Sequence, residues 1–570
     1  MTDPKPYPEA IFGRTANATD VLIIGAGISG LCTAIDMIKS GQGRNFLIVE
    51  KGNQVGGTWN DNIYPGCCCD VLSHLYSYSF EPNCEWTREY PGQEEIQGYL
   101  IGVANKYQLY RHIRFSSAVD EARWDDKNNK WRTKIKRLGG KEAEIGDFYT
   151  ISSDFLVSAV GQLNEPHYPN LPNTNAFNGK VMHSARWDWD YGLQGKRVGI
   201  IGTGATAAQI IPEIRPQCSQ LVVFQRTPAW VMPRHDHPIS KARQAIYKYI
   251  SFARRRYRAG LMDFRESVFD AAFDPTSTKH SIISNISQSH MHTQLTGDCY
   301  TSLSEKLTPK YPFSCKRIIV SDDYYPALVQ PNVFLETTAI SEVTPTGITM
   351  ANGTHHELDC IILATGFRTT KFLYPIRIYG SGGHSLSDAW EKGASAYLGI
   401  TVPFLPNFGI LYGPNTNLAY NSLILQIEAQ SLYINALIRV VLDSKRKGKT
   451  LNLIPKKSIV DQYNLEVQER LGKSTFADPR CTSWFKDESG RITTNWCGSA
   501  VDYQERVNYV DWSDYDILGS AAAEVERKGK TKWRRRVEET QVSDRVLVVS
   551  AAGVLVGMTA AAWWIWGPGL

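Results

Sequence analysis

The cysteines of this sequence lack the spacing of a metal site or of a small secreted protein. Their number, eleven, is odd, and no two C-x-x-C motifs stand in tandem as they do in zinc sites. The spacing also argues against a secreted disulfide framework. We therefore expect no bound metal and a reducing compartment that faces the cytosol.

The sequence also has little net charge, and it does not begin with an apolar run. A formal charge of +5 is small for 570 residues, so nothing indicates a nucleic acid as partner. The sequence begins MTDPKP, which is polar and Pro-rich and unlike a signal peptide. The 42% hydrophobic and 21% charged residues are ordinary for a globular enzyme. The length predicts about three or four domain-sized units.

A long uncharged run stands near the C-terminus. Residues 546–565 read VLVVSAAGVLVGMTAAAWWI, close to the roughly 20 apolar residues that span a bilayer as a helix. Three tryptophans lie at its far end, and seven Lys or Arg residues precede it within 527–536. By the positive-inside rule we expect a basic linker over 527–545 and a single-pass transmembrane helix over 546–566, with the catalytic part in the cytosol. The alternative is a tail that packs on the protein or on a second subunit.

The first glycine cluster predicts a turn that binds an adenine dinucleotide. A buried strand over 20–24 runs into GAGISG and then into an apolar helical stretch. In such a turn Gly25 allows a tight bend, Gly27 lets the backbone approach a pyrophosphate, and Gly30 lets the helix meet the strand. This cluster predicts one nucleotide-binding unit.

A second cluster repeats the pattern further along the chain. A strand over 196–201 is followed by GTGATA, in which alanine takes the third small-residue position. The candidate cofactor-binding residues of this segment are Gly202, Thr203, Gly204, Ala205, Thr206 and Gln209.

The residues that end the next strand distinguish the two clusters. After the first cluster a strand ends in Glu50, whose carboxylate can accept hydrogen bonds from a ribose diol, which favours FAD or NAD. After the second cluster the strand ends in Gln225-Arg226-Thr227, where a guanidinium and a hydroxyl suit a 2′-phosphate. We therefore predict FAD or NAD at the first site and NADPH at the second; the family resemblance described below implies FAD at the first.

Two echoing segments predict how the units are connected. Asp154–Gly161 and Asp359–Gly366 share the pattern D-x-h-h-x-A-x-G, with h apolar, and each is typical of a buried strand that ends in a glycine turn. The predicted fold is α/β, with two Rossmann-like domains and the NADP domain inserted in the FAD domain. The predicted boundaries are 1–165 for the first part of the FAD domain, 166–334 for the NADP domain with a helical insertion over about 231–309, and 335–526 for the second part of the FAD domain and a C-terminal substrate region.

Four segments resemble the type I Baeyer–Villiger monooxygenases. Phe177–Asp188 matches F-x-G-x-x-x-H-x-x-x-W-D, and Gly56–Asp70 matches G-G-x-W-x-x-x-x-Y-P-G-x-x-x-D. Tyr311–Arg317 resembles the segment that carries the family's active-site arginine, and Leu411–Leu418 resembles its return to the flavin ring. The resemblance covers about residues 15 to 500 and extends to membrane-anchored fungal biosynthetic members.

The resemblance implies roles for individual residues. Arg317 and Asp70 would form the catalytic pair, and Lys316 would lie beside the NADP phosphate. The other implied flavin-site residues are Thr58, Trp59, Tyr76, Asn417 and Leu418. The implied linker, which moves as NADP changes position, contains Phe177, Gly179, His183, Trp187 and Asp188.

The chemistry of the family explains the need for an arginine. Reduced FAD reacts with dioxygen to give a flavin peroxide, which must stay deprotonated to attack a ketone. A permanently charged guanidinium at Arg317 favours that anion, and Asp70 would hold the guanidinium in place. The product is an ester or lactone. The tail suggests a hydrophobic ketone such as a terpenoid, steroid or polyketide.

Three other functions compete with this hypothesis. A flavin monooxygenase that hydroxylates nitrogen or sulfur has a related signature, but it lacks the closing Trp187-Asp188. A disulfide reductase is disfavoured because Cys67, Cys68 and Cys69 are adjacent rather than spaced as C-x-x-C. A non-catalytic, membrane-anchored flavoprotein is the third alternative.

Overall fold

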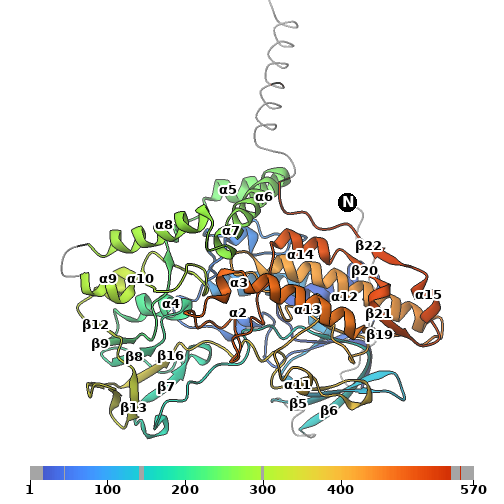
Figure 1. The fold of residues 1–570 in the computed structure, drawn as a ribbon, viewed down its shortest axis with the longest axis horizontal. Helices are drawn as coiled ribbons and strands as arrows, with labels where there is room; N and C mark the ends of the chain where they lie inside the picture. The colour runs from blue at the N-terminus through green and yellow to red at the C-terminus, as the bar shows by residue number, and fades with distance from the viewer. Residues whose placement is uncertain (1–16, 44, 140–146, 297–300, 541–552, 554–570) are drawn as a thin grey trace, which may run out of the picture.

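Two sheets with parallel cores form the body of the protein. The structure is a computed structural model and describes residues 17–43, 45–139, 147–296, 301–540 and 553. Figure 1 shows the two sheets on opposite sides of the molecule, with helices packed over and between them. The predicted α/β class with two Rossmann-like sheets is thereby confirmed.

The first sheet has eight strands in the order β17-β4-β5-β6-β1-β2-β3, with β18 paired to β6. Strands β1, β2, β3, β6 and β18 run parallel, and β4 and β5 form an antiparallel extension. The strands are β1 (Ala18–Ile24), β2 (Phe46–Val49), β3 (Ile113–Arg114), β4 (Ser117–Asp125), β5 (Lys130–Arg137), β6 (Phe148–Ser158), β17 (Arg377–Tyr379) and β18 (Phe408–Ile410).

The second sheet has five parallel strands in the order β12-β9-β8-β16-β7. These strands are β7 (Lys180–His183), β8 (Arg197–Ile201), β9 (Gln220–Phe224), β12 (Val333–Glu336) and β16 (Cys360–Leu363). A three-stranded antiparallel sheet joins β12 to β16, with strands β13 (Ile340–Thr344), β14 (Gly347–Met350) and β15 (His355–Glu357). The remaining strands pair in twos: β10 (Val231–Met232) with β11 (Ile319–Val320), β19 (Asn452–Pro455) with β21 (Tyr515–Leu518), and β20 (Tyr509–Asp511) with β22 (Lys530–Lys532).

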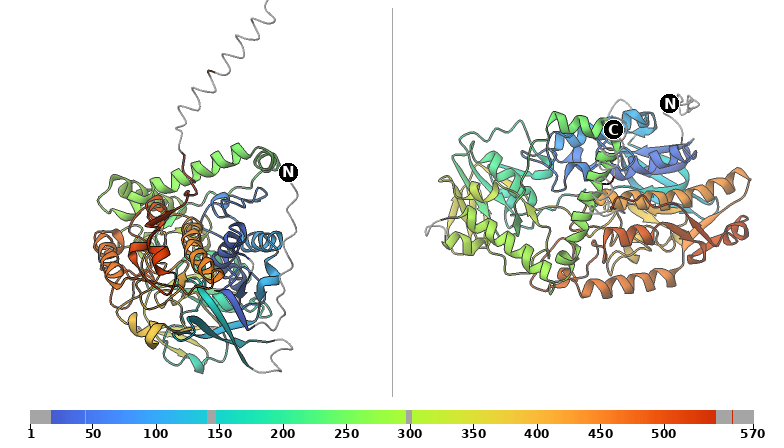
Figure 2. Two further views of the ribbon diagram at one scale, coloured as in Figure 1. Left: turned by 90° about the vertical axis from the view of Figure 1, so that its right-hand side faces the viewer. Right: turned by 90° about the horizontal axis from the view of Figure 1, so that it is seen from above.

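The helices of the described chain are α1 (Ile28–Lys39), α2 (Thr58–Asp61), α3 (Gln93–Lys106), α4 (Ala205–Ile214), α5 (Lys241–Tyr249), α6 (Ser251–Ser267), α7 (Phe269–Phe273), α8 (Thr278–Gln294), α9 (Thr301–Leu307), α10 (Tyr324–Leu328), α11 (Leu386–Ala389), α12 (Leu423–Arg446), α13 (Lys457–Gly472), α14 (Ala500–Arg506) and α15 (Ala522–Glu526). The helical insertion predicted over 231–309 contains β10 and helices α5 to α9. These helices cover one face of the molecule, as both views of Figure 2 show.

The two echoing segments belong to different sheets. The first lies in β6, which pairs with β1, and the second lies in β16, which fills the place between β8 and β7. The chain therefore leaves the first sheet after β6 and returns only after β16. The boundary predicted at residue 334 is too early, because the fully buried strand Cys360–Leu363 is needed to complete the second sheet.

Both glycine turns pack against the carbonyl oxygen of an alanine in one of the echoing segments. Gly25 has a φ of +102°, and a Cβ there would lie 2.7 Å from the carbonyl oxygen of Ala159. Gly202 has a φ of +116°, and its Cβ would lie 2.5 Å from the carbonyl oxygen of Ala364. Both turns thus need glycine for conformation and for space, because a side chain would meet backbone. The alanine in each echo is the residue on which the turn packs.

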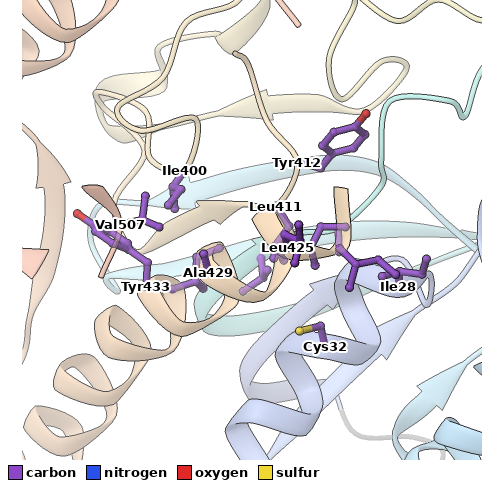
Figure 3. Close-up of a cluster of buried hydrophobic side chains, with 14 of the residues drawn as sticks. Ile28, Cys32, Ile400, Leu411, Tyr412, Leu425, Ala429, Tyr433 and Val507 are labelled. Atoms are coloured by element: carbon purple, nitrogen blue, oxygen red, sulfur yellow. The ribbon is translucent and has the colours of Figure 1, made fainter. Parts of the chain in front are cut away.

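The C-terminal half closes over the first sheet through a helix pair. Figure 3 shows Ile28 and Cys32 of α1 in one buried cluster with Leu425 and Ala429 of α12. Tyr412 lies in the same cluster, near the start of the 411–422 loop that leads to α12. This packing holds the 411–422 loop against the first nucleotide-binding unit.

The structure describes only part of the segment for which we predicted a basic linker and a transmembrane helix. In the part of the chain that the structure describes, no helix is long and apolar enough to cross a membrane. The span predicted over 546–566 lies outside the described residues, apart from residue 553. Within the predicted basic linker, β22 pairs with β20, and Arg536 donates to Asp36 of α1 at 2.6 Å. Ion pairs and strand pairing therefore bind residues 530–540 to the folded body.

Candidate active site

A cavity of about 1110 Å³ opens at the turns of both sheets. It exceeds the roughly 300–1,000 Å³ typical of a site for one drug-sized ligand, so it has room for two nucleotides. The predicted residues that line it are Gly25, Gly27, Glu50, Thr58, Trp59, Asp70, Tyr76, Gly202, Thr203, Gly204, Ala205, Thr206, Gln209, Arg226, Thr227, Lys316, Arg317, Asn417 and Leu418. Gly30 lies beneath the turn instead, where a Cβ would come within 1.9 Å of the carbonyl oxygen of Gly25.

Glu50 organises the end of the cavity at the first sheet. Its carboxylate accepts hydrogen bonds at 2.7 Å from the backbone N–H groups of Ala26 and Gly52. Burial raises the pKa of Glu50, and these two bonds oppose that shift. Each carboxylate oxygen keeps a further lone pair, so the residue fits a ribose diol as well as the turn.

Two cations mark the end of the cavity at the second sheet. Lys316 donates from Nζ to Oγ1 of Thr227 at 2.8 Å. Burial, and then the nearby guanidinium of Arg226, lower the pKa of Lys316 to about 8. A phosphate between these side chains would relieve the repulsion of like charges, so the donors fit the 2′-phosphate of NADPH.

Aromatic side chains form one wall between these ends. Trp59 donates from Nε1 to the hydroxyl of Tyr76 at 3.0 Å, and the two rings meet edge to face with centroids 5.6 Å apart. Thr58 begins helix α2 beside them. The buried pair presents flat apolar surface to the cavity, which fits an isoalloxazine ring.

Asp70 and Arg317 form a bidentate ion pair inside the cavity. Nε of Arg317 donates to Oδ2 of Asp70 at 2.8 Å, and Nη2 donates to Oδ1 at 2.6 Å. Burial alone would raise the pKa of Asp70, but the guanidinium outweighs burial and the pKa is lowered. Burial opposes the charge of Arg317 too, and Asp70 raises its pKa. Both residues therefore stay charged.

The 411–422 loop completes the surroundings of Arg317. Its Nη1 donates to the carbonyl oxygens of Leu418 and Ala419, at 3.2 and 3.0 Å. Asn417 accepts from the hydroxyl of Tyr412 at 2.7 Å and donates to the side chain of Asn495 at 2.7 Å. The side chain of Asn417 and the backbone of Leu418 are thereby held in place.

Arg265 and Glu266 of helix α6 brace this loop, and the sequence did not reveal them. Arg265 donates to the carbonyl oxygens of Asp70, at 3.2 Å, and Tyr420, at 3.4 Å. Glu266 accepts from the hydroxyl of Tyr420 at 3.0 Å and from the amide of Asn421 at 2.8 Å. These residues stand in no motif, and only the packing of the helical insertion brings them to the catalytic pair.

We expect Glu266→Gln to lower kcat about tenfold and to leave the Kd for NADPH unchanged. The substitution weakens charge-assisted hydrogen bonds, which are worth about 1.5–3 kcal/mol each, and loosens the loop that holds Arg317. Asp270→Asn, which changes an exposed carboxylate of the same insertion, is the control. A fall in both kcat and thermal stability would instead assign Glu266 a role in folding alone.

The linker signature lies outside the cavity. Phe177 packs over Gly179, where a Cβ would come within 2.6 Å of the Phe177 ring. His183 ends strand β7, and its Nδ1 accepts from the backbone N–H of Ala185 at 3.1 Å. Burial lowers its pKa to about 4, which keeps the ring neutral. Trp187 is buried, and Asp188 pairs with Lys180. A motion of this linker stays a prediction.

The cysteines near the cavity differ from expectation in one respect. Burial raises the pKa of Cys67 to about 12 and that of Cys68 to about 11, so both thiols stay protonated. Gln209 of helix α4 donates to the carbonyl oxygen of Cys68 at 3.1 Å and so joins the two units. The disulfide Cys315–Cys481 was not predicted. It ties the segment that carries Lys316 and Arg317 to residues 482–484, which line the cavity.

Comparison with known proteins identifies this arrangement. The model of the flavin-binding monooxygenase-like family matches residues 18–377. The chain belongs to that family. It is 44% identical over 565 residues to the FAD-binding monooxygenase ktnD of Aspergillus niger, covering 99% of this chain and 92% of the relative. It is 40% identical to a Baeyer–Villiger monooxygenase of Streptomyces coelicolor, covering 89% and 94%.

A solved structure agrees with the family assignment. The crystal structure of OTEMO complex with FAD and NADP superimposes with a TM-score of 0.76 at 27% identity, covering 88% of this chain and 100% of that one. The resemblance to Baeyer–Villiger monooxygenases is thus confirmed, and the chain is a flavin monooxygenase. The roles of individual residues stay predictions.

Proposed function

We propose that this enzyme uses FAD, NADPH and dioxygen to insert an oxygen atom beside a ketone, giving an ester or lactone. The observation that carries the proposal is the Asp70–Arg317 pair, which lies in a cavity shared by two nucleotide-binding turns. The Glu50 end fits FAD, and the Arg226 and Lys316 end fits NADPH. The crystal structure of OTEMO, which has a similar fold, is a complex with FAD and NADP.

The chain supplies a fixed positive charge to this reaction. When bound, reduced FAD supplies activated oxygen drawn from dioxygen, and NADPH supplies the hydride that reduces the flavin. The contacts of Arg317 with Asp70, Leu418 and Ala419 use four of the five N–H donors of a guanidinium. Among the described contacts, one Nη2 N–H is left for the oxygen of the ketone as it gains negative charge. Asp70 holds that donor in place.

The wall of the cavity and the composition of the tail support a proposal for the substrate class. Leu418 and the side chains of Leu423 and Ile427 on α12 line the cavity and are apolar. A hydrophobic ketone of natural-product or steroid-like size suits such a wall. We propose that the uncharged run over 546–566 anchors the enzyme to a membrane in which such a ketone dissolves, with the catalytic part on the cytosolic side.

The reaction is tested with the purified full chain, NADPH, a panel of ketones and dioxygen enriched in oxygen-18. We expect NADPH oxidation to be stimulated by a hydrophobic ketone and one labelled oxygen to appear in an ester. Label found only on nitrogen or sulfur would instead support heteroatom hydroxylation. FAD binding without NADPH turnover on any ketone would support a non-catalytic flavoprotein. If alkaline carbonate extracted the chain from membranes, the proposed anchor would be contradicted, but the proposed reaction would stand.

The second cofactor site is tested by comparing KM for NADPH with KM for NADH in a variant of Arg226. We expect Arg226→Ala to raise KM for NADPH about 10- to 100-fold, because a charge-assisted contact to phosphate is worth about 1.5–3 kcal/mol. KM for NADH, which has no 2′-phosphate, should hardly change. Arg215→Ala is the control, since Arg215 follows helix α4 and does not line the cavity. Equal losses for both nucleotides would contradict the role given to Arg226.

Binding of NADPH should also weaken as the pH rises through about 8. The pKa of Lys316 is lowered to about 8, so its ammonium is present below that pH and is lost above it, together with its attraction for phosphate. The Kd for NADPH, measured from about pH 7 to about pH 9.5, should show a step that NADH lacks. Lys316→Met should remove the step. A step that persists in this variant would belong to another group.

A further inference from the structure

The helical insertion carries an exposed corner whose side chains are apolar. Helix α5 ends at Tyr249 and α6 begins at Ser251, so the chain turns at Ile250. The corner patch consists of Ile246, Tyr249, Ile250 and Phe252, which are 46%, 80%, 52% and 66% exposed. Ile246 and Tyr249 stand three residues apart on α5 and so share one face of it, and Ile250 follows at the turn. Water in contact with four large apolar side chains is costly, so such a patch indicates a binding surface.

Exposed cations flank the corner patch along the sequence. Residues 241–258 contain seven Lys or Arg residues and no Asp or Glu. Lys241, Lys248 and Arg255 are exposed. Lys248 pairs with Glu85 at 2.8 Å, but both side chains are more than half exposed, and such a surface pair is weak enough to exchange partners. Apolar side chains within a basic rim match the composition of a surface that binds anionic lipid headgroups.

The last continuous stretch of the described chain, which ends at Thr540, contacts the same helix α6. Glu538 forms a buried ion pair with Arg258 of α6, and the backbone N–H of Thr540 donates to Asp263 of α6 at 3.0 Å. Along α6, Arg258 lies about 9 Å from Phe252, at 1.5 Å per residue. Figure 1 and Figure 2 both show the end of the described chain beside α6. The described part of the tail therefore contacts α6, the helix that also carries Phe252 of the corner patch.

Chain length limits how far this corner can lie from a membrane. Five residues, 541–545, separate Thr540 from the run that begins at residue 546. Fully extended, they reach roughly 20 Å, at about 3.3–3.6 Å per residue. If the tail spans a bilayer, α6 is held within that distance of the headgroups.

We propose that the corner patch and its cations form a second membrane contact, which inserts into the headgroup region of an anionic bilayer. Two points of attachment, the tail and the corner, fix the orientation of the catalytic body on the membrane. The inference goes beyond the proposed reaction. It rests on the proposed anchor for the height of α6 above the bilayer and for the second point of attachment, but the corner contact itself is tested separately.

The test uses the full chain in nanodiscs of phosphatidylcholine and phosphatidylserine in roughly a three to one mixture. The photoreactive residue p-benzoylphenylalanine replaces Tyr249, Phe252, Trp564 or Phe334, one at a time. Phe334 is 49% exposed on β12, away from the corner patch (Figure 1), and serves as the control. After irradiation, lipid adducts are measured by mass spectrometry. The FAD absorbance and the Tm of each variant verify folding.

We expect adduct yields at Tyr249 and Phe252 to be at least about tenfold above that at Phe334. Adding Lys241→Glu and Arg255→Glu should lower the yield at Tyr249 about fivefold or more, because each cation near an anionic surface contributes about a fivefold change. In nanodiscs of pure phosphatidylcholine, the yield at Tyr249 should be the same with and without these two substitutions. Adducts at Trp564 with none at Tyr249 and Phe252 would overturn the corner contact and keep the anchor. Adducts at Tyr249 and Phe252 without any at Trp564 would support the corner and overturn the anchor. Crosslinks at Tyr249 to a second copy of the chain instead of lipid would overturn the corner contact as well.

Discussion

Replacing Arg317 with alanine should lower the rate of ester formation about 100- to 1,000-fold. A preorganised donor that faces developing negative charge contributes about 3–4 kcal/mol to a barrier, and the cavity supplies this charge at a fixed place. FAD content and the Kd for NADPH should change little, because Glu50 and Arg226 hold the nucleotides elsewhere. The rate of labelled ester formation is measured beside the rate of NADPH oxidation, since loss of the ketone reaction would leave NADPH oxidation running without product.

Two further variants separate charge from geometry at this position. Arg317→Lys keeps a cation but cannot form the bidentate contact with Asp70, so we expect most of the rate to be lost. Arg186→Ala removes a half-exposed arginine that lies 3.9 Å from Asp61 and should leave the rate unchanged. Ester formation that survives in Arg317→Ala would refute the role proposed for the guanidinium, although the cofactor sites would stand.

Replacing Arg258 with methionine should lower the free energy of unfolding by about 3–5 kcal/mol. Arg258 and Glu538 form an ion pair with side chains only 6% and 8% exposed. Arg258 also donates to the carbonyl oxygen of Ser77 at 2.9 Å and to its hydroxyl at 3.2 Å. Removal of one partner leaves Glu538 buried without its counter-charge, which is the costly case for an ion pair. Denaturant unfolding of the FAD-loaded enzyme measures the change.

The double variant Arg258→Met with Glu538→Leu is the matched control. It removes both charges and fills their place with apolar atoms, so most of the lost stability should return. A double variant as unstable as the single one would mean that Arg258 acts through its contacts with Ser77 and the carbonyl oxygen of His74 rather than through Glu538. Arg255→Met, at an exposed position of the same helix, should have little effect.

Local patterns in the sequence were enough to predict the nucleotide-binding turns. Gly25 and Gly202 are required by the backbone of a turn a few residues long. Glu50 follows a strand of the first sheet, Arg226 follows a strand of the second, and both line one cavity. Such features depend on neighbours in sequence, so a motif records them. The Asp70–Arg317 pair was also predicted, through resemblance, although 247 residues separate its members.

Other parts of the site were decided by packing between distant segments. Arg265 and Glu266 contact the catalytic loop from a helix without a motif, and Cys315 meets Cys481 across 166 residues. The domain boundary was misplaced because membership of β16 in the second sheet depends on which strands it pairs with, and a buried apolar strand fits the composition of either sheet.

The sequence by itself therefore predicted the two nucleotide-binding turns and their difference in charge, because each depends on short patterns with a fixed local geometry, and it predicted the candidate catalytic pair through resemblance. The tertiary structure alone decided what braces the catalytic arginine, which strand completes the second sheet, and where the end of the chain meets the helical insertion. These depend on contacts between side chains far apart in sequence, and no periodicity or spacing along the chain encodes such contacts.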